Sequence, residues 1–282
     1  MRISRRFIQC DVFSSIPCRG NALAVVVDAE GLSDDDMAAF AAWTNLAETT
    51  FLLPATDPSA DYRVRIFTPN REMPFAGHPT LGSCASWLHA GGTPMHKSVV
   101  RQECGVGIVE IRLNGDVPAF VAPPTRIATL ETAIADRLLG KMGLDTTSVI
   151  ASARLDNGPV WQVFELASAA DVLSVNASTL KWPDEVAIGL IGAHPSGHEC
   201  QYEVRMLAPS SGMSEDPITG SLNSALAHWF DKRNKLPDAM VVAQGTVIGR
   251  SGRVHVSRDA GNRDNILVGG HTHILVEGSV SL

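Results

Sequence analysis

The stretch YRVRIFTPNREMPFAGHPTLGS, residues 62–83, returns in altered form as YEVRMLAPSSGMSEDPITGS, residues 202–221. Tyrosine, valine, arginine, proline and methionine recur at an offset of 140 residues. After a gap of two residues, His-Pro-x-x-Gly-Ser at 78–83 matches Asp-Pro-x-x-Gly-Ser at 216–221. This offset is far longer than the period of a solenoid repeat. It therefore predicts two similarly folded halves that face each other across a pseudo-twofold axis.

Each half is predicted to run from a strand through a glycine-bearing loop into a helix. Residues 62–69 alternate between apolar and polar side chains, which is typical of a half-buried strand, and they stop at a proline. Helices are predicted from Pro79 to the glycine pair 91–92, and from Pro217 in the second half. A helix N-terminus presents unpaired N–H groups and the positive end of its dipole. Two of them at one cleft would bind an anion such as a carboxylate.

Other patterns predict a further helix and strand in the first half, and a pair of strands in each half. Ser33 and Asp36 have the spacing of a capping box before a helix, and residues 49–54 resemble a strand. Gln102 and Gln244 each begin a glycine-punctuated pair of strands. These two pairs of strands extend the similarity of the halves beyond the quoted stretches.

A hinge between the halves is predicted in VAPPTRIAT, where prolines stand at positions 123 and 124. The N-terminal half then covers residues 1–124, and the C-terminal half covers residues 125–282. The last strand, residues 272–282, is a candidate to complete the N-terminal half.

Composition and charge exclude several classes of partner. The chain has 282 residues, 45% of them hydrophobic and 19% charged, as expected for a globular protein with a sizeable core. Its formal net charge of −7 and its lack of Lys/Arg-rich runs argue against nucleic acid or an anionic membrane as a partner. No apolar run is long enough to cross a bilayer, and the N-terminus lacks a signal-peptide pattern, so a cytoplasmic location is predicted.

Cysteine and histidine spacing gives no reason to expect a metal site. The five cysteines, at 10, 18, 84, 104 and 200, lack CxxC spacing, which favours reduced, buried thiols over disulfides or zinc ligands. His271 and His273 would share one face of a strand, where a solvated face is favoured over metal binding.

Four residues are candidates for chemistry, and each also has an ordinary structural explanation. His78 could simply open a helix, Asp216 could be an N-cap, and Ser221 could be a small packing residue. Because His78 and Asp216 stand at matching points of the repeat, we interpret them as an acid/base pair that flanks one cleft.

Glu48 lies between a predicted helix and a predicted strand, with apolar neighbours. An ordinary solvated glutamate at a helix end is one interpretation. If an apolar cleft desolvates the carboxylate, its pKa rises from about 4.3 toward neutrality, as a general acid/base requires. Such a group contributes about 10²–10⁴-fold in rate.

Several other mechanisms lack their motifs. No GxGxxG follows a strand, and neither GxxxxGK[ST] nor GxSxG is present. Two-thiol racemisation needs a cysteine at each matched helix start, where this sequence has His78 and Asp216.

Four segments together are similar to the PhzF family of phenazine-biosynthesis isomerases: GNALAVVVDAEGLSDDDMAAFAAWTNLAETTFLLP, residues 62–83, DNGPVWQVFEL and EDPITGSLNSALAHW. The combination of NLxET, FAGHPT and EDPxTGS is far more specific than any one motif. The resemblance implies an α+β fold like that of diaminopimelate epimerase, with two similar halves, each a mixed sheet wrapped around a central helix. It also implies a cofactor-free homodimer that moves a proton within trans-2,3-dihydro-3-hydroxyanthranilate or a related compound.

Carried over to this chain, the resemblance makes Glu48 the proton carrier, while His78, Asp216 and Ser221 hold and polarise the substrate. The expected substrate-binding residues are Asn21, Gly77 and Gly220. Two rival functions stay open, and both also have a small molecule as partner. One is an amino-acid-type racemase or epimerase on the same fold, and the other is a non-catalytic small-molecule binding protein.

Overall fold

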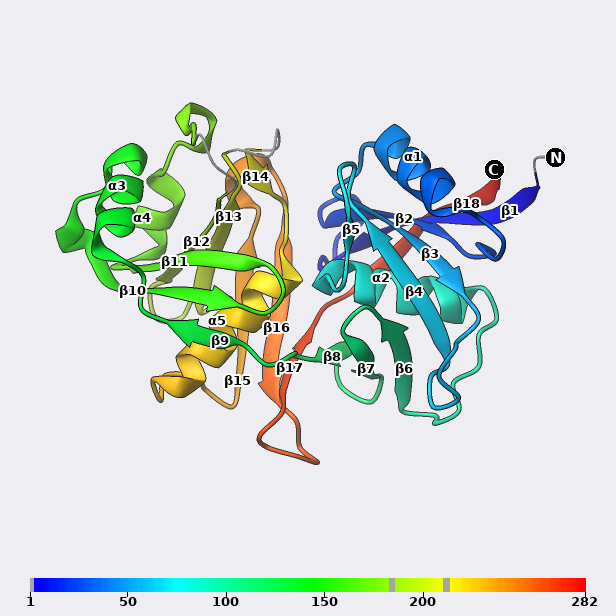
Figure 1. Cartoon of the computed structure of the whole chain (residues 1–282). Helices are drawn as coiled ribbons and strands as arrows, with labels where there is room; N and C mark the ends of the chain where they lie inside the picture. The colour runs from blue at the N-terminus through cyan, green and yellow to red at the C-terminus, as the bar shows by residue number, and fades with distance from the viewer. Residues whose placement is uncertain (1–2, 183–185, 210–213) are drawn as a thin grey trace. The chain divides into compact units, whose positions relative to one another are not determined.

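The protein is described from a computed structural model. The structure describes residues 3–182, 186–209 and 214–282. The chain forms two compact units (Figure 1). Unit 1 comprises the described residues up to Val121 together with Val268–Leu282, and unit 2 comprises the described residues of Ala122–Leu267. The first division thus follows Val121, where the sequence placed it after residue 124, and the chain returns to unit 1 at Val268.

Unit 1 is built from strands and two helices. Its elements are β1 (Ser4–Val12), β2 (Asn21–Val26), α1 (Asp34–Thr44), β3 (Glu48–Leu53), β4 (Tyr62–Phe67), β5 (Glu72–Met73), α2 (Gly77–His89), β6 (Val99–Cys104), β7 (Gly107–Arg112), β8 (Ala119–Val121) and β18 (Thr272–Ser281).

Unit 2 repeats this order and adds a helix near its start. Its elements are β9 (Arg126–Ala128), α3 (Thr132–Met142), β10 (Val149–Asp156), β11 (Val160–Leu166), α4 (Ala169–Ser174), β12 (Ala187–Ala193), β13 (Tyr202–Leu207), β14 (Glu215–Asp216), α5 (Gly220–Lys232), β15 (Ala239–Gln244) and β16 (Gly252–Arg258). Short 3₁₀ turns occupy Thr146–Ser148, Ala177–Thr179 and Thr246–Ile248, and β17 (Ile266–Gly269) crosses the boundary back to unit 1.

The strand pairings are the same in both units. In unit 1, β1 is antiparallel to β2, β2 is parallel to β3, β3 is antiparallel to β4, and β4 lies antiparallel to β5 and parallel to β6. In unit 2, β10, β11, β12, β13, β14 and β15 pair in the same sequence of directions. Phe67 faces Glu72 in the first unit and Leu207 faces Glu215 in the second. This confirms the two similarly folded halves predicted from the repeat.

Local sequence explains the first helix of unit 1. The Ser33 hydroxyl accepts from the Asp36 backbone N–H, and the Asp36 carboxylate accepts from the Ser33 N–H, so the predicted capping box is confirmed. The helix ends at Thr44, and the C-cap residue Asn45 closes the last turn with a left-handed backbone.

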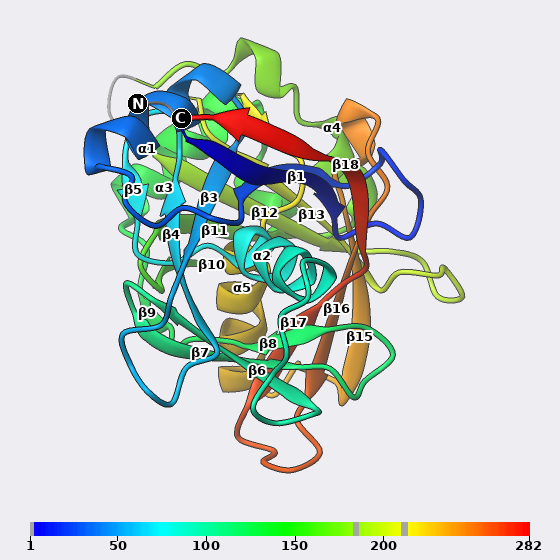
Figure 2. The same ribbon diagram turned by 90° about the vertical axis from the view of Figure 1, so that its right-hand side faces the viewer.

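A central helix forms part of the core of each unit. Figure 2 shows α2 among strands of unit 1, and it contacts β1, β2, β3, β6, β8 and β18. The helix approaches the sheet closely at Gly82, where a Cβ atom would lie 2.5 Å from Leu23 Cδ2 and 2.9 Å from Cys10 Sγ. In unit 2, α5 is buried along most of its length and contacts β10 and β16. The predicted α+β fold, a mixed sheet around a central helix in each half, is confirmed.

Both central helices begin elsewhere than predicted. Helix α2 begins at Gly77, two residues before Pro79, and ends at His89. Helix α5 begins at Gly220 rather than at Pro217, because pairing of β14 with β13 holds residues 215–216 extended, and Thr219 is the N-cap with extended backbone.

These helix starts also correct the repeat alignment. From β5 and β14 through the central helices the offset is 143 residues, because the connection after β13 is three residues longer than the connection after β4, and it returns to 140 at β6 and β15. The structural counterpart of His78 is therefore Ser221, and that of Asp216 is Met73. The matching of His78 with Asp216 was wrong, since the two Pro-x-x-Gly-Ser patterns stand at different points of the fold.

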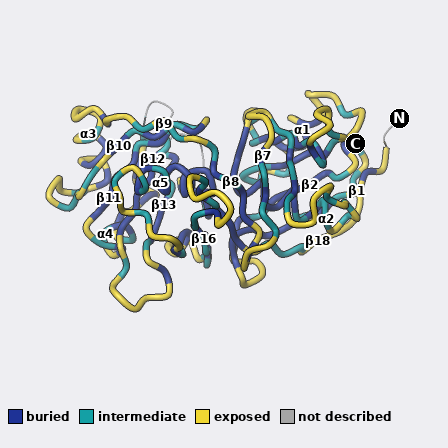
Figure 3. The backbone as a smooth tube through the Cα atoms, turned by 90° about the horizontal axis from the view of Figure 1, so that it is seen from below, coloured by how far each residue is buried: buried dark blue, intermediate teal, exposed yellow. Residues whose placement is uncertain are grey.

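Figure 3 shows buried backbone along the strands and central helices, with exposed loops and outer helices α1 and α3. Within the described ranges, no helix is both long enough and apolar enough to cross a membrane. All five cysteines are free, and Cys10, Cys84 and Cys200 are buried as predicted. Cys18 is instead exposed, because it lies in the loop between β1 and β2 with a left-handed backbone (φ 64°).

Candidate functional site

The first half-site lies in unit 1, where β3 and α2 begin. Glu48 is the first residue of β3, and His78 is the second residue of α2. His78 Nδ1 lies 3.3 Å from Glu48 Oε2, and the two side chains are 3% and 18% exposed. The structure therefore brings together two residues that are 30 positions apart in the chain and were singled out from the sequence.

Burial decides the charge of the imidazole. It lowers the pKa of His78 from 6.5 to about 3, and a contact with the Ala22 backbone opposes this only in part. The ring is thus neutral at physiological pH, so its contact with Glu48 is not an ion pair.

Asn21, the first residue of β2, also reaches His78: its Nδ2 atom lies 3.4 Å from the same Nδ1. In one tautomer Nδ1 accepts from the Asn21 amide, and in the other it donates toward Glu48. The remaining nitrogen, Nε2, is buried without a hydrogen-bond partner among the residues that the structure describes. His78 can therefore exchange a proton at one nitrogen and contact a ligand at the other.

Hydroxyl pairs fix β3 against its neighbours just beyond Glu48. The Ser83 hydroxyl of α2 donates to Thr50 at 3.0 Å, and the hydroxyls of Thr44 and Thr49 lie 2.8 Å apart. The two residues that follow Glu48 thus contact both helices of the unit, which restricts where the Glu48 carboxylate can lie.

The second half-site lies in unit 2, between β14 and the start of α5. Asp216 and Ser221 are buried, at 7% and 5% exposure. The Thr219 hydroxyl donates to Asp216 Oδ2. Asp216 is the last residue of β14 and Ser221 is the second residue of α5, so these two predicted site residues stand at the two ends of one short connection.

Asn157 belongs to this half-site and was missed in the sequence. Its Nδ2 donates to the Ser221 carbonyl oxygen at 2.8 Å, and its Oδ1 accepts from Trp161 Nε1 at 3.0 Å. In each unit an asparagine beside the first hairpin thus contacts the second residue of the central helix. The signal was present in the quoted DNGPVW segment, but only the fold relates Asn157 to Asn21.

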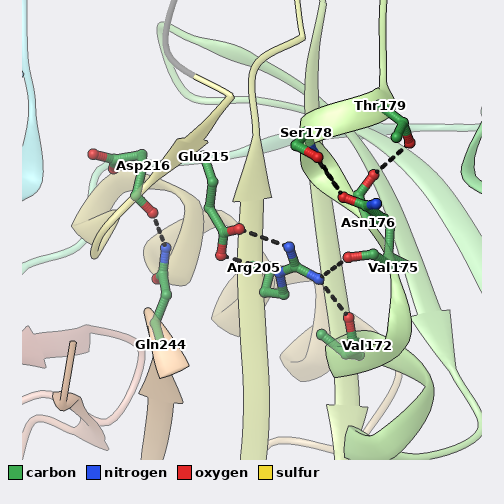
Figure 4. Close-up of polar contacts among 9 residues, drawn as sticks. All are labelled: Val172, Val175, Asn176, Ser178, Thr179, Arg205, Glu215, Asp216 and Gln244. Carbon is green, nitrogen blue, oxygen red and sulfur yellow. Dashed lines mark hydrogen bonds and ion pairs between the residues drawn. The ribbon is translucent and has the colours of Figure 1, made fainter. Parts of the chain in front are cut away.

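Gln244, at the end of β15, was noted as part of a strand pattern but given no role. It is fully buried, and its Oε1 accepts from the Thr219 N–H at 3.1 Å and from Asn223 Nδ2 at 2.9 Å. Its Nε2 donates to Thr219 Oγ1 at 3.0 Å. Figure 4 shows Gln244 directed at the backbone oxygen of Asp216.

The predicted binding glycines, Gly77 and Gly220, are the first residues of α2 and α5, and both are buried. The N-cap residues Ala76 and Thr219 do not accept side-chain hydrogen bonds from their helices, unlike Ser33 in α1. Each central helix therefore begins with first-turn N–H groups that no N-cap side chain satisfies, and this arrangement suits an anion.

Ionisable groups are distributed unevenly between the units. Thr49 faces Phe67 and Ile188 faces Leu207, so the counterpart of Glu48 in unit 2 is Ala187. At the second helix position, His78 in unit 1 corresponds to Ser221 in unit 2. At these matched positions the carboxyl–imidazole pair thus occurs in unit 1 and not in unit 2, and neither helix start carries a thiol.

Comparison with known proteins places this chain in a family. The family described as phenazine biosynthesis-like protein (PhzC-PhzF) matches residues 10–278. The Schizosaccharomyces pombe protein antisense-enhancing sequence 1 is 35% identical over 290 residues, which cover 96% of this chain and 97% of the relative. The trans-2,3-dihydro-3-hydroxyanthranilate isomerase of Pseudomonas aeruginosa is 32% identical over 288 residues, which cover 98% and 99%.

A solved structure gives the same result for the fold. The crystal structure of the Bacillus anthracis phenazine biosynthesis protein of the PhzF family matches with a TM-score of 0.81 at 22% identity, over 99% of each chain. This chain therefore belongs to the PhzC-PhzF family of phenazine biosynthesis-like proteins, and it is an isomerase.

Proposed function

We propose that this isomerase moves a proton within a small carboxylate-bearing substrate, trans-2,3-dihydro-3-hydroxyanthranilate or a related compound. The observation that carries the proposal is the presence of the Glu48–His78 pair in unit 1, where unit 2 has Ala187 and Ser221. A racemase that uses two bases needs one on each side of the carbon that it inverts. A carboxyl–imidazole pair at only one of the two matched helix starts instead suits removal and return of a proton by the same group.

Glu48 is the proposed proton carrier. Its carboxylate takes a proton from one carbon, the C–H electron pair shifts the double bond, and the acid form returns the proton to a second carbon. Neutral His78 lies within 3.3 Å and holds the carboxyl group in place without a competing positive charge. Its buried Nε2 can contact a polar group of the substrate.

The polar groups of unit 2 are proposed to bind and polarise a carboxylate-bearing substrate of this kind. Asp216 would accept a hydrogen bond from its amino or hydroxyl group, and Ser221 would donate to its carboxylate. The first-turn N–H groups at Gly77 and Gly220 are further donors of the kind that carboxylates accept. Buried, preorganised donors of this type are worth more than donors in water.

The proposed chemistry uses side chains of the chain alone, so we expect it to proceed without a cofactor. Assembly as a homodimer and a cytoplasmic location stay predictions. Size-exclusion chromatography with light scattering measures the assembly.

The test is NMR of trans-2,3-dihydro-3-hydroxyanthranilate with the protein in D₂O, beside the variants Glu48→Gln and Glu277→Gln. Glu277 is exposed on β18, so its variant controls for loss of a carboxylate as such. Deuterium incorporation with double-bond migration, lost only in Glu48→Gln, supports the proposal. Inversion at a stereocentre without migration would support an epimerase instead, and exchange that survives in Glu48→Gln would refute the role of Glu48.

A further inference from the structure

We propose that Gln244 is a positioning residue, which turns the Thr219 hydroxyl onto Asp216 and thereby fixes the Asp216 carboxylate for the substrate. The catalytic consequence rests on the proposed function, whereas the orientation of the hydroxyl can be measured without any substrate.

The hydrogen bonds of Gln244 determine which way its amide points. A backbone N–H can only donate, so the atom that faces the Thr219 N–H at 3.1 Å must be the amide oxygen. Asn223 Nδ2, at 2.9 Å from the same oxygen, gives it a second donor. The amide nitrogen therefore faces Thr219 Oγ1 at 3.0 Å and must donate to it.

This donation fixes the direction of the Thr219 hydroxyl. Because Oγ1 already accepts from Gln244, its own proton is directed to its other polar neighbour, Asp216 Oδ2. A hydroxyl that donates to a carboxylate makes a charge-assisted hydrogen bond, which is stronger than a neutral one. Thr219 is 7% exposed and Gln244 is fully buried, so water does not compete freely for these positions.

The backbone next to Gln244 supports the same segment. Gly245 has φ +87°, and a Cβ atom there would lie 2.6 Å from the Pro217 carbonyl oxygen. The end of β15 thus lies directly against the residues that follow Asp216. Gln244 and Gly245 together hold this segment by one side chain and one close backbone approach.

Unit 1 contains a similar glutamine–threonine contact at a different point of the fold, since strand register matches Gln102 with Val242. Gln102 is also fully buried, accepts from the Tyr62 hydroxyl at 2.8 Å, and donates to Thr80 Oγ1 at 3.2 Å. The Thr80 hydroxyl, however, donates to the Ala76 backbone oxygen at 2.9 Å. A glutamine–threonine contact therefore leads to the helix backbone in unit 1 and to a carboxylate in unit 2.

The variant Gln244→Glu separates the two functions of the side chain. Its carboxylate keeps the shape and still accepts from Thr219 N–H and Asn223, but it can donate neither to Thr219 Oγ1 nor to the more distant Asp216 backbone oxygen. The hydroxyl is then expected to turn to Glu at position 244 and leave Asp216. We expect kcat to fall about 10²-fold with little change in KM, because a misplaced polar group acts mainly in the transition state.

Two further variants show whether the effect passes through Thr219. Thr219→Val should lower kcat by a similar factor, and the double variant should lose no more than either single one, because both remove the same contact. Gln102→Glu is the control: it lowers the melting temperature through its buried charge, while kcat stays near the wild-type value.

Wild-type kcat in Gln244→Glu, or losses that multiply in the double variant, would overturn the proposal. Crystal structures of the wild type and Gln244→Glu decide the orientation independently of activity. Thr219 Oγ1 within hydrogen-bond distance of Asp216 in both structures would also overturn it. If the wild type does not turn over the test compound, the proposed substrate is wrong, and the two structures alone decide the role of Gln244.

Discussion

In unit 1 the second residue of the central helix is His78, and the first residue of the neighbouring strand is Glu48; in unit 2 the corresponding residues are Ser221 and Ala187. Asp216, in turn, corresponds to Met73 in unit 1. One scaffold, used twice, thus presents a neutral imidazole with a carboxyl group in one unit, and hydroxyls, amides and a hydrogen-bonded carboxylate in the other. The two units therefore share a fold but do not share the carboxyl–imidazole pair.

The same two units also contain a matched ion pair in different surroundings. Arg65 Nε and Nη2 contact Glu72 at 2.8 and 2.7 Å, and the same atoms of Arg205 contact Glu215 at 3.0 and 2.6 Å (Figure 4). The side chains of the first pair are 15% and 44% exposed, whereas those of the second are 1% and 2% exposed. Only the second pair lies next to a proposed catalytic residue, Asp216.

The largest effect is expected from Glu48→Gln. Loss of the general acid/base should lower kcat by up to about 10⁴-fold, or ~5 kcal/mol, measured by NMR turnover in D₂O. Adding Ala187→Glu to this variant places a carboxylate at the matched position of unit 2, and we expect no recovery. Recovery of exchange by the added carboxylate would contradict the assignment of the base to unit 1, because either unit could then carry it.

Arg205→Met is expected to have the next largest effect, on stability. Removing one partner leaves the buried Glu215 carboxylate uncompensated, which costs about 3–5 kcal/mol of unfolding free energy. Arg65→Met, at the exposed pair, should cost about 1 kcal/mol or less. Urea unfolding measures both values, and equal losses would show that burial does not distinguish the two pairs.

His78→Asn should lower kcat by about 10²-fold, since it removes the group that we propose to hold the Glu48 carboxyl. The counterpart Ser221→Ala should act mainly on substrate affinity and raise KM, because its hydroxyl is proposed to donate to the substrate carboxylate. Steady-state kinetics of the two variants separates these roles. A larger loss of kcat in Ser221→Ala than in His78→Asn would reverse the assignment of the units.

The smallest expected effect is on the pH dependence of stability. The pKa of His78 falls from 6.5 to about 3 on folding, so between these values the unfolded chain binds more protons than the folded chain. Stability is therefore fully present above pH 6.5 and decreases as the pH falls toward 3, by about 1 kcal/mol per pH unit from this residue. His228, whose pKa burial also lowers, acts in the same direction.

Unfolding curves between pH 6 and 5 for the wild type and His78→Gln measure this contribution. The variant should show a flatter dependence on pH. The same slope in both proteins would mean that His78 titrates normally in the folded state.

The two similarly folded halves could be predicted from the repeated stretch, because similar residues at a regular offset indicate a similar backbone. The helix starts did not, since letters such as Pro-x-x-Gly-Ser recur at Pro79 and Pro217 although only one proline lies inside its helix. Whether a proline begins a helix depends on strand pairing around it, which is a tertiary property.

The candidate site shows the same limit. Glu48 and His78 were recognisable from their motifs, and their contact required the fold to confirm it. Asn157 and Gln244 carry no local signal of function, because an asparagine in a turn and a glutamine at a strand end are ordinary. Their roles arise from hydrogen bonds to residues 64 and 25 positions away in the chain.

The pairing of β1 with β18 sets an order of events during synthesis. Ser4 faces Ser281, so β1 acquires this neighbour only after residue 281 has been made. Unit 2, by contrast, lies on one continuous segment that is complete before them. On the ribosome, which releases residues in sequence, unit 2 can therefore fold first, while β1 stays exposed along the edge that β18 later covers. Premature termination would leave a finished second unit attached to an unfinished first one with an open strand edge.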